Sequence, residues 1–183
     1  MTAVTCRIAT TDDVQAIAAL HADSWRRNYR GAYLDSFLDG DVLPERVATW
    51  TERISRPSQP TITIVAESDG DVVGFAHTIF DEDGTWGALL DNLHVTHARK
   101  SSGIGSLLMA ETATAVLRER PGSGLYLWVL EQNEAAQRFY EGRRGTKGDR
   151  ELGGPFPGGG RAYKIRYAWP DPSILIRGPS ETP

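Results

Sequence analysis

The sequence predicts an α/β fold (α+β in some classifications): a mixed, partly antiparallel central sheet with helices on both faces. Two observations carry this prediction. Three β-rich segments joined by short turns lie consecutively in residues 61–95, which favours an antiparallel meander. A strand, a helix and a second strand follow within residues 88–130, and strands joined through a helix lie parallel. The complete expected order is β-α-α-β-β-β-α-β-α-β-β.

The N-terminal part contributes one strand and two helices. Residues 4–9 are typical of a short strand. Thr10 and Asp13 then form a capping-box pattern in which Asp replaces the usual Glu, and apolar residues recur at helical spacing up to a stop at Gly31. Pro44 suits the first turn of the second helix.

The middle of the chain forms the meander and the parallel unit. Turn residues separate three expected strands at 61–67, 72–80 and 88–95. The apolar period then becomes helical over 103–120, and residues 125–130 are a strongly apolar strand.

The C-terminal part completes the sheet. We expect a short helix at 133–141, followed by two strands on either side of a glycine- and proline-rich stretch at 153–160, the second strand being 161–169. These elements predict one domain over residues 1–169 and an irregular tail over 170–183.

Length, charge and cysteine content restrict the class of protein. The chain has 183 residues, which suffices for one well-packed domain. A net charge of -4 gives no overall basic character, and no apolar run approaches membrane-spanning length, so we expect neither a nucleic-acid nor a membrane partner. The single Cys6 excludes an intrachain disulfide and, with no signal-peptide pattern, favours a cytoplasmic location. A homodimer is left open.

A glycine-containing turn lies between the strand at 88–95 and the helix that follows it. Free backbone N–H groups and the positive end of a helix dipole favour an anion at such a helix start. Gly103 and Gly105 let a ligand approach the backbone closely, and Lys100 adds a positive charge. The pattern predicts a diphosphate-binding turn, although a glycine-rich turn that binds nothing fits the same residues.

The spacing of this turn bears on the nucleotide classes. The Gly-x-x-x-x-Gly-Lys-Ser/Thr pattern of a Walker loop is absent, and Leu108 stands where a Rossmann turn needs a small residue. Glu131, at the end of the next strand, is the one residue placed to hold a ribose hydroxyl group. An NAD-type oxidoreductase is therefore a minor alternative.

Two motifs in the expected order resemble those of the GNAT N-acetyltransferase superfamily. Residues 100–105 read Lys-x-x-Gly-x-Gly, similar to the family's Gln/Arg-x-x-Gly-x-Gly/Ala motif. Residues 133–141 read Asn-x-x-Ala-x-x-Phe-Tyr-Glu, which resembles the family block that follows the fifth strand. The resemblance covers about residues 3–169, and the family's strand order agrees with the order predicted above.

The resemblance implies acetyl-CoA as the acetyl donor. In the family, the backbone of the glycine turn holds the coenzyme pyrophosphate, and the strand before it faces the pantetheine arm and the thioester. Asn133 is implied to contact the coenzyme, although it is also a good helix N-cap. The residues implied to bind coenzyme are Leu93, Val95, Lys100, Ser101, Ser102, Gly103, Ile104, Gly105, Ser106, Asn133, Ala136 and Phe139.

The same resemblance suggests catalytic roles. Acetyl transfer to an amine needs a group that takes the amine proton and one that protonates the leaving thiolate. Tyr140 is the implied general acid, although an aromatic at this spacing also suits a core position. Many family members carry Glu on the fourth strand where Leu89 stands here, so Asp91, His94 or a water chain is left as the base.

The acceptor and the non-catalytic alternatives are less defined. Trp25, Tyr29 and Tyr33 are candidates to line the cleft for a small-molecule or peptide amine. His94 and His97 are three residues apart with no carboxylate at ligand spacing, so we expect no metal site. The missing Glu at position 89 also fits a non-catalytic acyl-CoA-binding module of the same fold.

Overall fold

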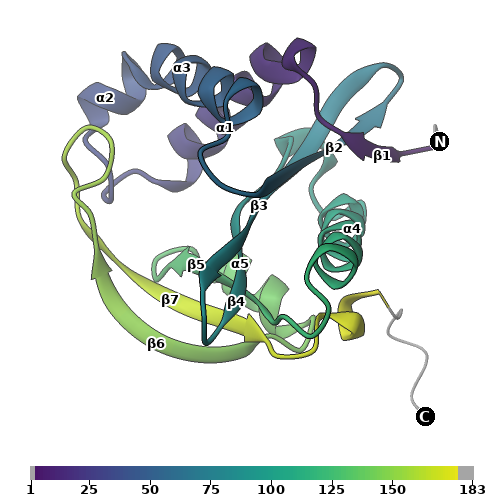
Figure 1. Ribbon diagram of the computed structural model, residues 1–183. Helices are drawn as coiled ribbons and strands as arrows, with labels where there is room; N and C mark the ends of the chain where they lie inside the picture. The colour runs from purple at the N-terminus through teal and green to yellow at the C-terminus, as the bar shows by residue number, and fades with distance from the viewer. Residues whose placement is uncertain (1–2, 177–183) are drawn as a thin grey trace.

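The computed structural model describes residues 3–176, in which a seven-stranded sheet has the order β1-β2-β3-β4-β5-β7-β6 (Figure 1). Only β4 and β5 pair in parallel; the other neighbours within residues 3–176 are antiparallel. The mixed sheet predicted from the sequence is confirmed. The strands are β1 (Thr5–Ile8), β2 (Thr61–Ser68), β3 (Asp71–Asp83), β4 (Gly87–Val95), β5 (Leu125–Leu130), β6 (Thr146–Gly153) and β7 (Ala162–Trp169).

Helices cover both faces of the sheet, as predicted. Figure 1 shows α1, α2 and α3 together on one side and α4 on the other. Ile17 of α1 and Trp50 of α3 pack with Phe75 of β3 in one core, whereas Leu108 of α4 and Tyr140 of α5 belong to the core on the opposite face. The helices are α1 (Val14–Asn28), α2 (Asp35–Asp39), α3 (Val42–Ser55), α4 (Ile104–Glu119) and α5 (Glu134–Glu141).

The capping box at the start of the first helix is present. The Thr10 N–H donates to Asp13 Oδ2 at 2.7 Å, and the Arg7 guanidinium pairs with the same carboxylate at 2.7 Å. The hydrogen bonds from Arg7 hold the pKa of Asp13 below its ordinary value. The box opens a 3₁₀ turn over residues 11–13, so α1 itself begins at Val14.

One boundary and one additional helix differ from the prediction. Helix α1 ends at Asn28 and Gly31 lies in the following turn, with a φ of 81° that favours glycine. Helix α2 was not expected, because its five residues bury only Leu38 and are too few to display a helical period. Helix α3 begins at Val42, which places Pro44 in its first turn, as predicted.

The beginning of the expected irregular tail is ordered. Pro172–Leu175 forms a 3₁₀ helix, and Ile174 and Leu175 pack against the core beside α4. Residues 177–183 of the tail lie outside the described part of the chain.

The central pair of strands separates soon after it forms. β4 and β5 pair only through Ala88–Leu125 and Leu89–Tyr126. The β3–β4 register then shifts at Asp91, which marks a bulge in β4. Beyond the bulge the two strands diverge, which leaves unpaired backbone edges in the middle of the sheet.

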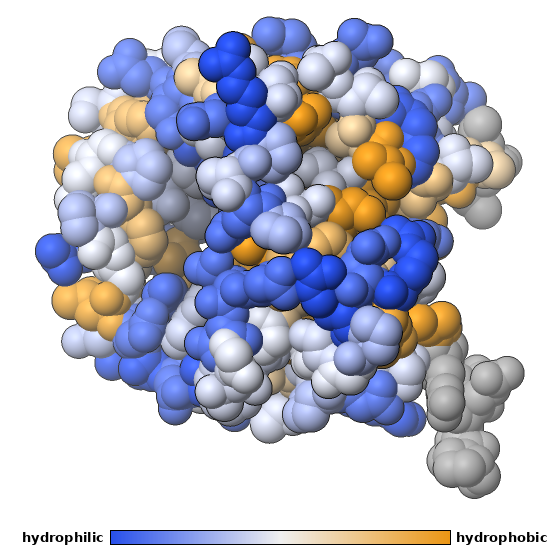
Figure 2. Space-filling view, in the orientation of Figure 1, coloured by the Kyte–Doolittle hydropathy of each residue, from blue (hydrophilic) through white to orange (hydrophobic). Residues whose placement is uncertain are grey.

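The surface gives no sign of a membrane span. Hydrophobic residues reach the face shown in Figure 2 only in groups that hydrophilic residues interrupt. Between residues 3 and 176, no helix combines the length and apolar character needed to cross a bilayer.

Candidate active site

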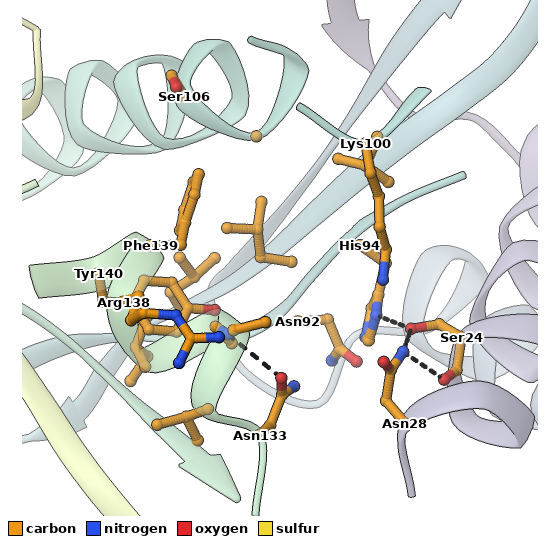
Figure 3. Close-up of a pocket in the computed structure, with 18 of the residues that line it drawn as sticks. Ser24, Asn28, Asn92, His94, Lys100, Ser106, Asn133, Arg138, Phe139 and Tyr140 are labelled. Atoms are coloured by element: carbon orange, nitrogen blue, oxygen red, sulfur yellow. Dashed lines mark hydrogen bonds between the residues drawn. The ribbon is translucent and has the colours of Figure 1, made fainter. Parts of the chain in front are cut away.

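A cavity of about 640 Å³ occupies the gap between the diverging strands. Its walls come from α1, the second half of β4, the turn before α4, β5 and α5. Figure 3 shows Ser24, Asn28 and His94 on one side of this cavity and Phe139 and Tyr140 on the other. The cavity therefore passes through the sheet and has two chemically different ends.

One end lies at the start of α4. Gly103 precedes the helix with a φ of 87°, and Ser101 also has a positive φ, of 64°. No side chain caps this helix start, so the N–H groups of its first turn are free for a ligand. A Cβ on Gly103 would meet no atom within 4 Å, which leaves open space beside this backbone. Such a turn suits a bound anion.

Positive side chains line the cavity, and Arg143 among them contacts the first turn of α4. Arg99, Lys100, Arg138 and Arg143 all line the cavity. Asp91, far from this turn along β4, is the single carboxylate among the described lining residues. The end at α4 is therefore suited to an anionic ligand.

Arg143 is held in place by several contacts. Its guanidinium lies 3.6 Å from the centre of the Phe139 ring and contacts Ser106 Oγ in the first turn of α4. Its carbonyl accepts a hydrogen bond from Trp169 Nε1 at 2.8 Å. Its Nε is buried without a partner among the described residues. The arrangement aims a restrained cation at the helix start.

Gly105 is required for a close approach of two helices. A Cβ at this position would lie 3.0 Å from Cζ of Phe139 in α5. The second glycine of the motif therefore lets Phe139 pack against α4 and form the cavity wall between the helices.

The middle of the cavity is the open edge of β4. The N–H of Thr96 donates to Val73 O of β3 at 2.9 Å. Because N–H groups alternate along a strand, those of Val95 and Leu93 point the other way, toward β5. This edge can bind the amide groups of an extended ligand as a neighbouring strand would.

Tyr140 lies on the wall of the cavity opposite Ser24, Asn28 and His94 (Figure 3). Its side chain is buried with 8% exposure, and its hydroxyl has no hydrogen-bond partner within residues 3–176. Burial raises its pKa above the ordinary value, so the phenol keeps its proton and can donate it. Tyr140 is thus a core residue and a cavity-lining residue at the same time, the two positions considered from the sequence.

We name the other end of the cavity, lined by Asp91 and His94, the acceptor end after the expectation from the sequence. Asp91 Oδ2 accepts from Arg53 Nη1 at 2.7 Å and from the Asn92 amide at 2.5 Å. The Nδ1 of His94 lies 2.8 Å from Ser24 Oγ of α1. Burial lowers the pKa of His94 to about 4, so its imidazole is neutral near pH 7.

The three aromatic residues expected at the acceptor separate into two groups. Tyr29 lines the cavity, and burial raises its pKa to about 12. Trp25 and Tyr33 do not line it: they pack in the core behind Tyr29, with exposures of 6% and 8%. This placement corrects the expectation for both, because each ring is enclosed by neighbouring aromatic side chains.

Most residues expected to contact coenzyme lie on the cavity wall, with two exceptions. Ile104 is buried in the core, so only its backbone is available at the helix start. Ser102 donates from Oγ to Arg99 O at 2.6 Å and shapes the turn. Asn133 is the N-cap of α5, because its side chain accepts from the Ala136 N–H at 3.2 Å, and the residue also lines the cavity.

Several lining residues were missed by the sequence reasoning. Ser24 and Asn28 come from α1, Asn92 from β4, Trp128 from β5 and Arg143 from the turn after α5. Only Arg143 had a local signal, since it closely follows the Phe-Tyr-Glu block. In the part of the chain that the structure describes, no cluster of three metal-ligating side chains occurs.

Comparisons with known proteins identify a family and relatives that match most of the chain. The model of the Acetyltransferase (GNAT) family matches residues 15–145. The chain is 28% identical to the uncharacterized N-acetyltransferase YuaI of Bacillus subtilis, over 94% of this chain and 96% of that protein. It is 29% identical to the probable N-acetyltransferase Rv2775 of Mycobacterium tuberculosis, over 74% of this chain and 75% of that protein.

Solved structures show the same fold. The PaiA N-acetyltransferase of Thermoplasma acidophilum, in complex with coenzyme A, aligns with a TM-score of 0.69 at 16% identity, covering 91% of this chain and 99% of that one. The chain therefore belongs to the GNAT family of acetyltransferases.

Proposed function

We propose that this acetyltransferase uses acetyl-CoA as its donor and acetylates a primary amine. The observation that carries the proposal is the cavity through the sheet, with a cationic helix start at one end and proton-accepting groups at the other. The two proposed substrates match these two ends: coenzyme A is negatively charged, and a basic amine carries a proton to be removed.

The residues present fit coenzyme A. The free N–H groups at the start of α4 and the restrained guanidinium of Arg143 suit its phosphates. The open edge of β4 at Leu93 and Val95 suits the amide groups of its pantetheine arm. When bound, acetyl-CoA supplies the activated acetyl group.

Two side-chain roles follow from the proton requirements of the transfer. Tyr140, protonated and without a partner, donates a proton to the leaving sulfur. Asp91 or His94 takes the amine proton, directly or through water. A backbone N–H of the β4 edge stabilises negative charge on the acetyl oxygen.

The two alternative functions have less support from the site. Glu131, the residue that favoured an NAD-type oxidoreductase, pairs with Arg150 at 2.7 Å and is not on the cavity wall. A non-catalytic acyl-CoA-binding module would need neither a protonated phenol nor a neutral imidazole facing the cavity. We further propose a cytoplasmic location, which the single Cys6 favours.

Thermal unfolding with acetyl-CoA, NAD and ATP at matched concentrations tests the donor. A ligand at one hundred times its Kd stabilises the fold by about 2.7 kcal/mol. We expect a rise in Tm with acetyl-CoA alone. A rise with NAD alone would contradict the proposal.

The acceptor is tested by thiol release from acetyl-CoA with spermidine, kanamycin, a free-N-terminus dipeptide and a lysine peptide blocked at its N-terminus. Turnover with at least one amine is expected. Acetyl-CoA binding without turnover of any amine would favour the non-catalytic module.

A further inference from the structure

Ser24 and His94 form a contact between α1 and β4 inside the cavity. The Oγ–Nδ1 distance is 2.8 Å, and both residues line the wall at the acceptor end (Figure 3). Asn28, one turn along α1, donates from Nδ2 to the Ser24 carbonyl at 2.8 Å and lies 3.4 Å from Ser24 Oγ. The serine hydroxyl is therefore fixed from both sides.

His94 lines the cavity, and its other ring nitrogen, Nε2, takes no part in the contact with Ser24. No hydrogen-bond partner for Nε2 occurs among the described residues. The imidazole plane is held by His21, with ring centres 4.6 Å apart, and by Phe75, with ring centres 5.3 Å apart. His94 is thus oriented by its neighbours, and its protonation pattern depends on the contact at Nδ1.

A neutral imidazole carries one proton on either nitrogen, and only the bare nitrogen accepts another. If Nδ1–H donates to Ser24 Oγ, the lone pair is on Nε2. If Ser24 donates to Nδ1 instead, Nε2 carries a proton and cannot take one from an amine. The partner at Nδ1 therefore decides whether His94 is a base.

We propose that Ser24 is the positioning residue of this site: its hydroxyl oxygen accepts the Nδ1 proton of His94, so that Nε2 takes the proton of the acceptor amine. This inference rests on the proposed N-acetyltransferase function. The amine N–H bond breaks as the proton moves to Nε2, and the freed electron pair is available for the new amide bond. His94 becomes an imidazolium that still donates from Nδ1 to Ser24 and later loses the Nε2 proton to water.

His94 suits this role better than Asp91. The Asp91 carboxylate is already engaged by Arg53 at 2.7 Å and by the Asn92 amide. Both contacts fall on Oδ2, so the carboxylate is oriented by Arg53 and Asn92, whereas Nε2 of His94 has no such partner among the described residues. The charged and titratable groups acting on or packed against His94 are Asp91 of β4, Arg46 of α3, Lys100 of the following turn and His21 of α1.

Nitrogen-15 NMR of the imidazole rings tests the proposal without any substrate. The chain has four histidines, and His94→Gln identifies the resonances of His94. We expect the wild-type proton on Nδ1. We expect this preference to be lost in Ser24→Ala and kept in Ser24→Thr. A wild-type proton on Nε2, or unchanged spectra in Ser24→Ala, would overturn the proposal.

Kinetics with the fastest amine from the panel above provides the second readout. Ser24→Ala should lower kcat about tenfold, the effect of one lost hydrogen bond, and leave the Kd of acetyl-CoA unchanged. Ser24→Thr should restore most of the rate. Thr114→Ala is the matched control, because it removes another helix hydroxyl, bonded to Ala110 O at 2.9 Å on α4.

The two readouts separate the possible failures. An unchanged kcat in Ser24→Ala would overturn the role of Ser24 even with acetyl transfer established. If no amine is acetylated, the proposed function fails, while the wild-type NMR measurement still decides the tautomer. That measurement also applies if Ser24→Ala does not fold.

Discussion

The two ends of the cavity are built in different ways. The end of the cavity at α4, which we propose binds coenzyme and call the coenzyme end, comes from two short stretches of chain, residues 99–106 and 133–143. It uses backbone N–H groups and arginine side chains. The acceptor end brings together Ser24 of α1 with Asp91 and His94 of β4, all through side chains. Backbone geometry serves a ligand common to a family, whereas side chains from separate elements can change with the acceptor.

The two ends of the cavity also differ in charge. Arginine and lysine side chains keep their charge at every working pH, so the coenzyme end remains cationic. The acceptor end contains neutral buried groups whose proton binding depends on their surroundings. Variants at the first end should change affinity for acetyl-CoA, and variants at the second should change turnover.

The largest effect is expected on turnover, from a change at Tyr140. Tyr140→Phe removes the hydroxyl that donates to the leaving sulfur, so kcat should fall by about 10²–10⁴-fold. The Kd of acetyl-CoA, measured by calorimetry, should stay within about twofold of the wild-type value, because the ring remains in the core. Unchanged turnover would show that another group is the acid.

Acid should destabilise the fold through three histidines on the α1 and α3 side of the sheet. Burial lowers the pKa of His77 and His94 to about 4 from an ordinary 6.5, and lowers that of His21 as well. Between these values the unfolded chain binds more protons, so stability is full above pH 6.5 and falls toward pH 4. Each histidine contributes up to about 1.4 kcal/mol per pH unit.

Denaturant titrations between pH 7 and pH 4.5 measure this dependence. His94→Gln should reduce the slope by the contribution of one proton. A flat dependence would contradict the buried neutral state of the three histidines.

A smaller effect is expected for the cation at the coenzyme end. Arg143→Ala should raise the Kd of acetyl-CoA about tenfold or more, the usual contribution of a hydrogen bond to a charged group. Arg118→Ala is the control, because Arg118 pairs only with Glu119 on the exposed side of α4. Equal effects of the two changes on Kd would indicate nonspecific charge attraction instead of a phosphate contact.

The smallest effect is expected at two glycines with similar backbone geometry, where backbone strain can be distinguished from ligand binding. Gly103 and Gly122 have φ values of 87° and 83°, and a Cβ at either would meet no atom within 4 Å. Alanine at each should cost about 1–2 kcal/mol of stability through the left-handed backbone. Only Gly103→Ala should also weaken acetyl-CoA binding in calorimetry. Equal loss of affinity in Gly122→Ala would contradict a specific role for the turn.

The fold and the coenzyme end could be predicted because their signals are local. Apolar patterns and turn residues predicted most strands and four of the helices, and the motifs of residues 100–105 and 133–141 predicted part of the cavity wall. The polar strand β6 has no such pattern. The short helix α2 was missed because five residues cannot display a period. Ser24 was missed because the serine is 70 residues from its partner His94, and no spacing rule connects them.

The aromatic candidates at the acceptor show a second limit. Trp25 and Tyr29 are one helical turn apart, and periodicity places both on one face of α1. Packing then decides between them: Arg46 and Tyr33 cover Trp25, which leaves Tyr29 on the cavity wall. Such a choice depends on neighbours distant in the sequence.

The brief pairing of β4 with β5 leaves a seam down the middle of the sheet. Only two residue pairs connect the strands β1–β4 to the strands β5–β7 across it. In the free protein, water must satisfy the exposed backbone edges along this seam. A ligand that fills it with its own amide groups replaces that water and joins the two parts of the sheet. Under the proposed function, the donor molecule is therefore a structural component of the protein during each cycle of use.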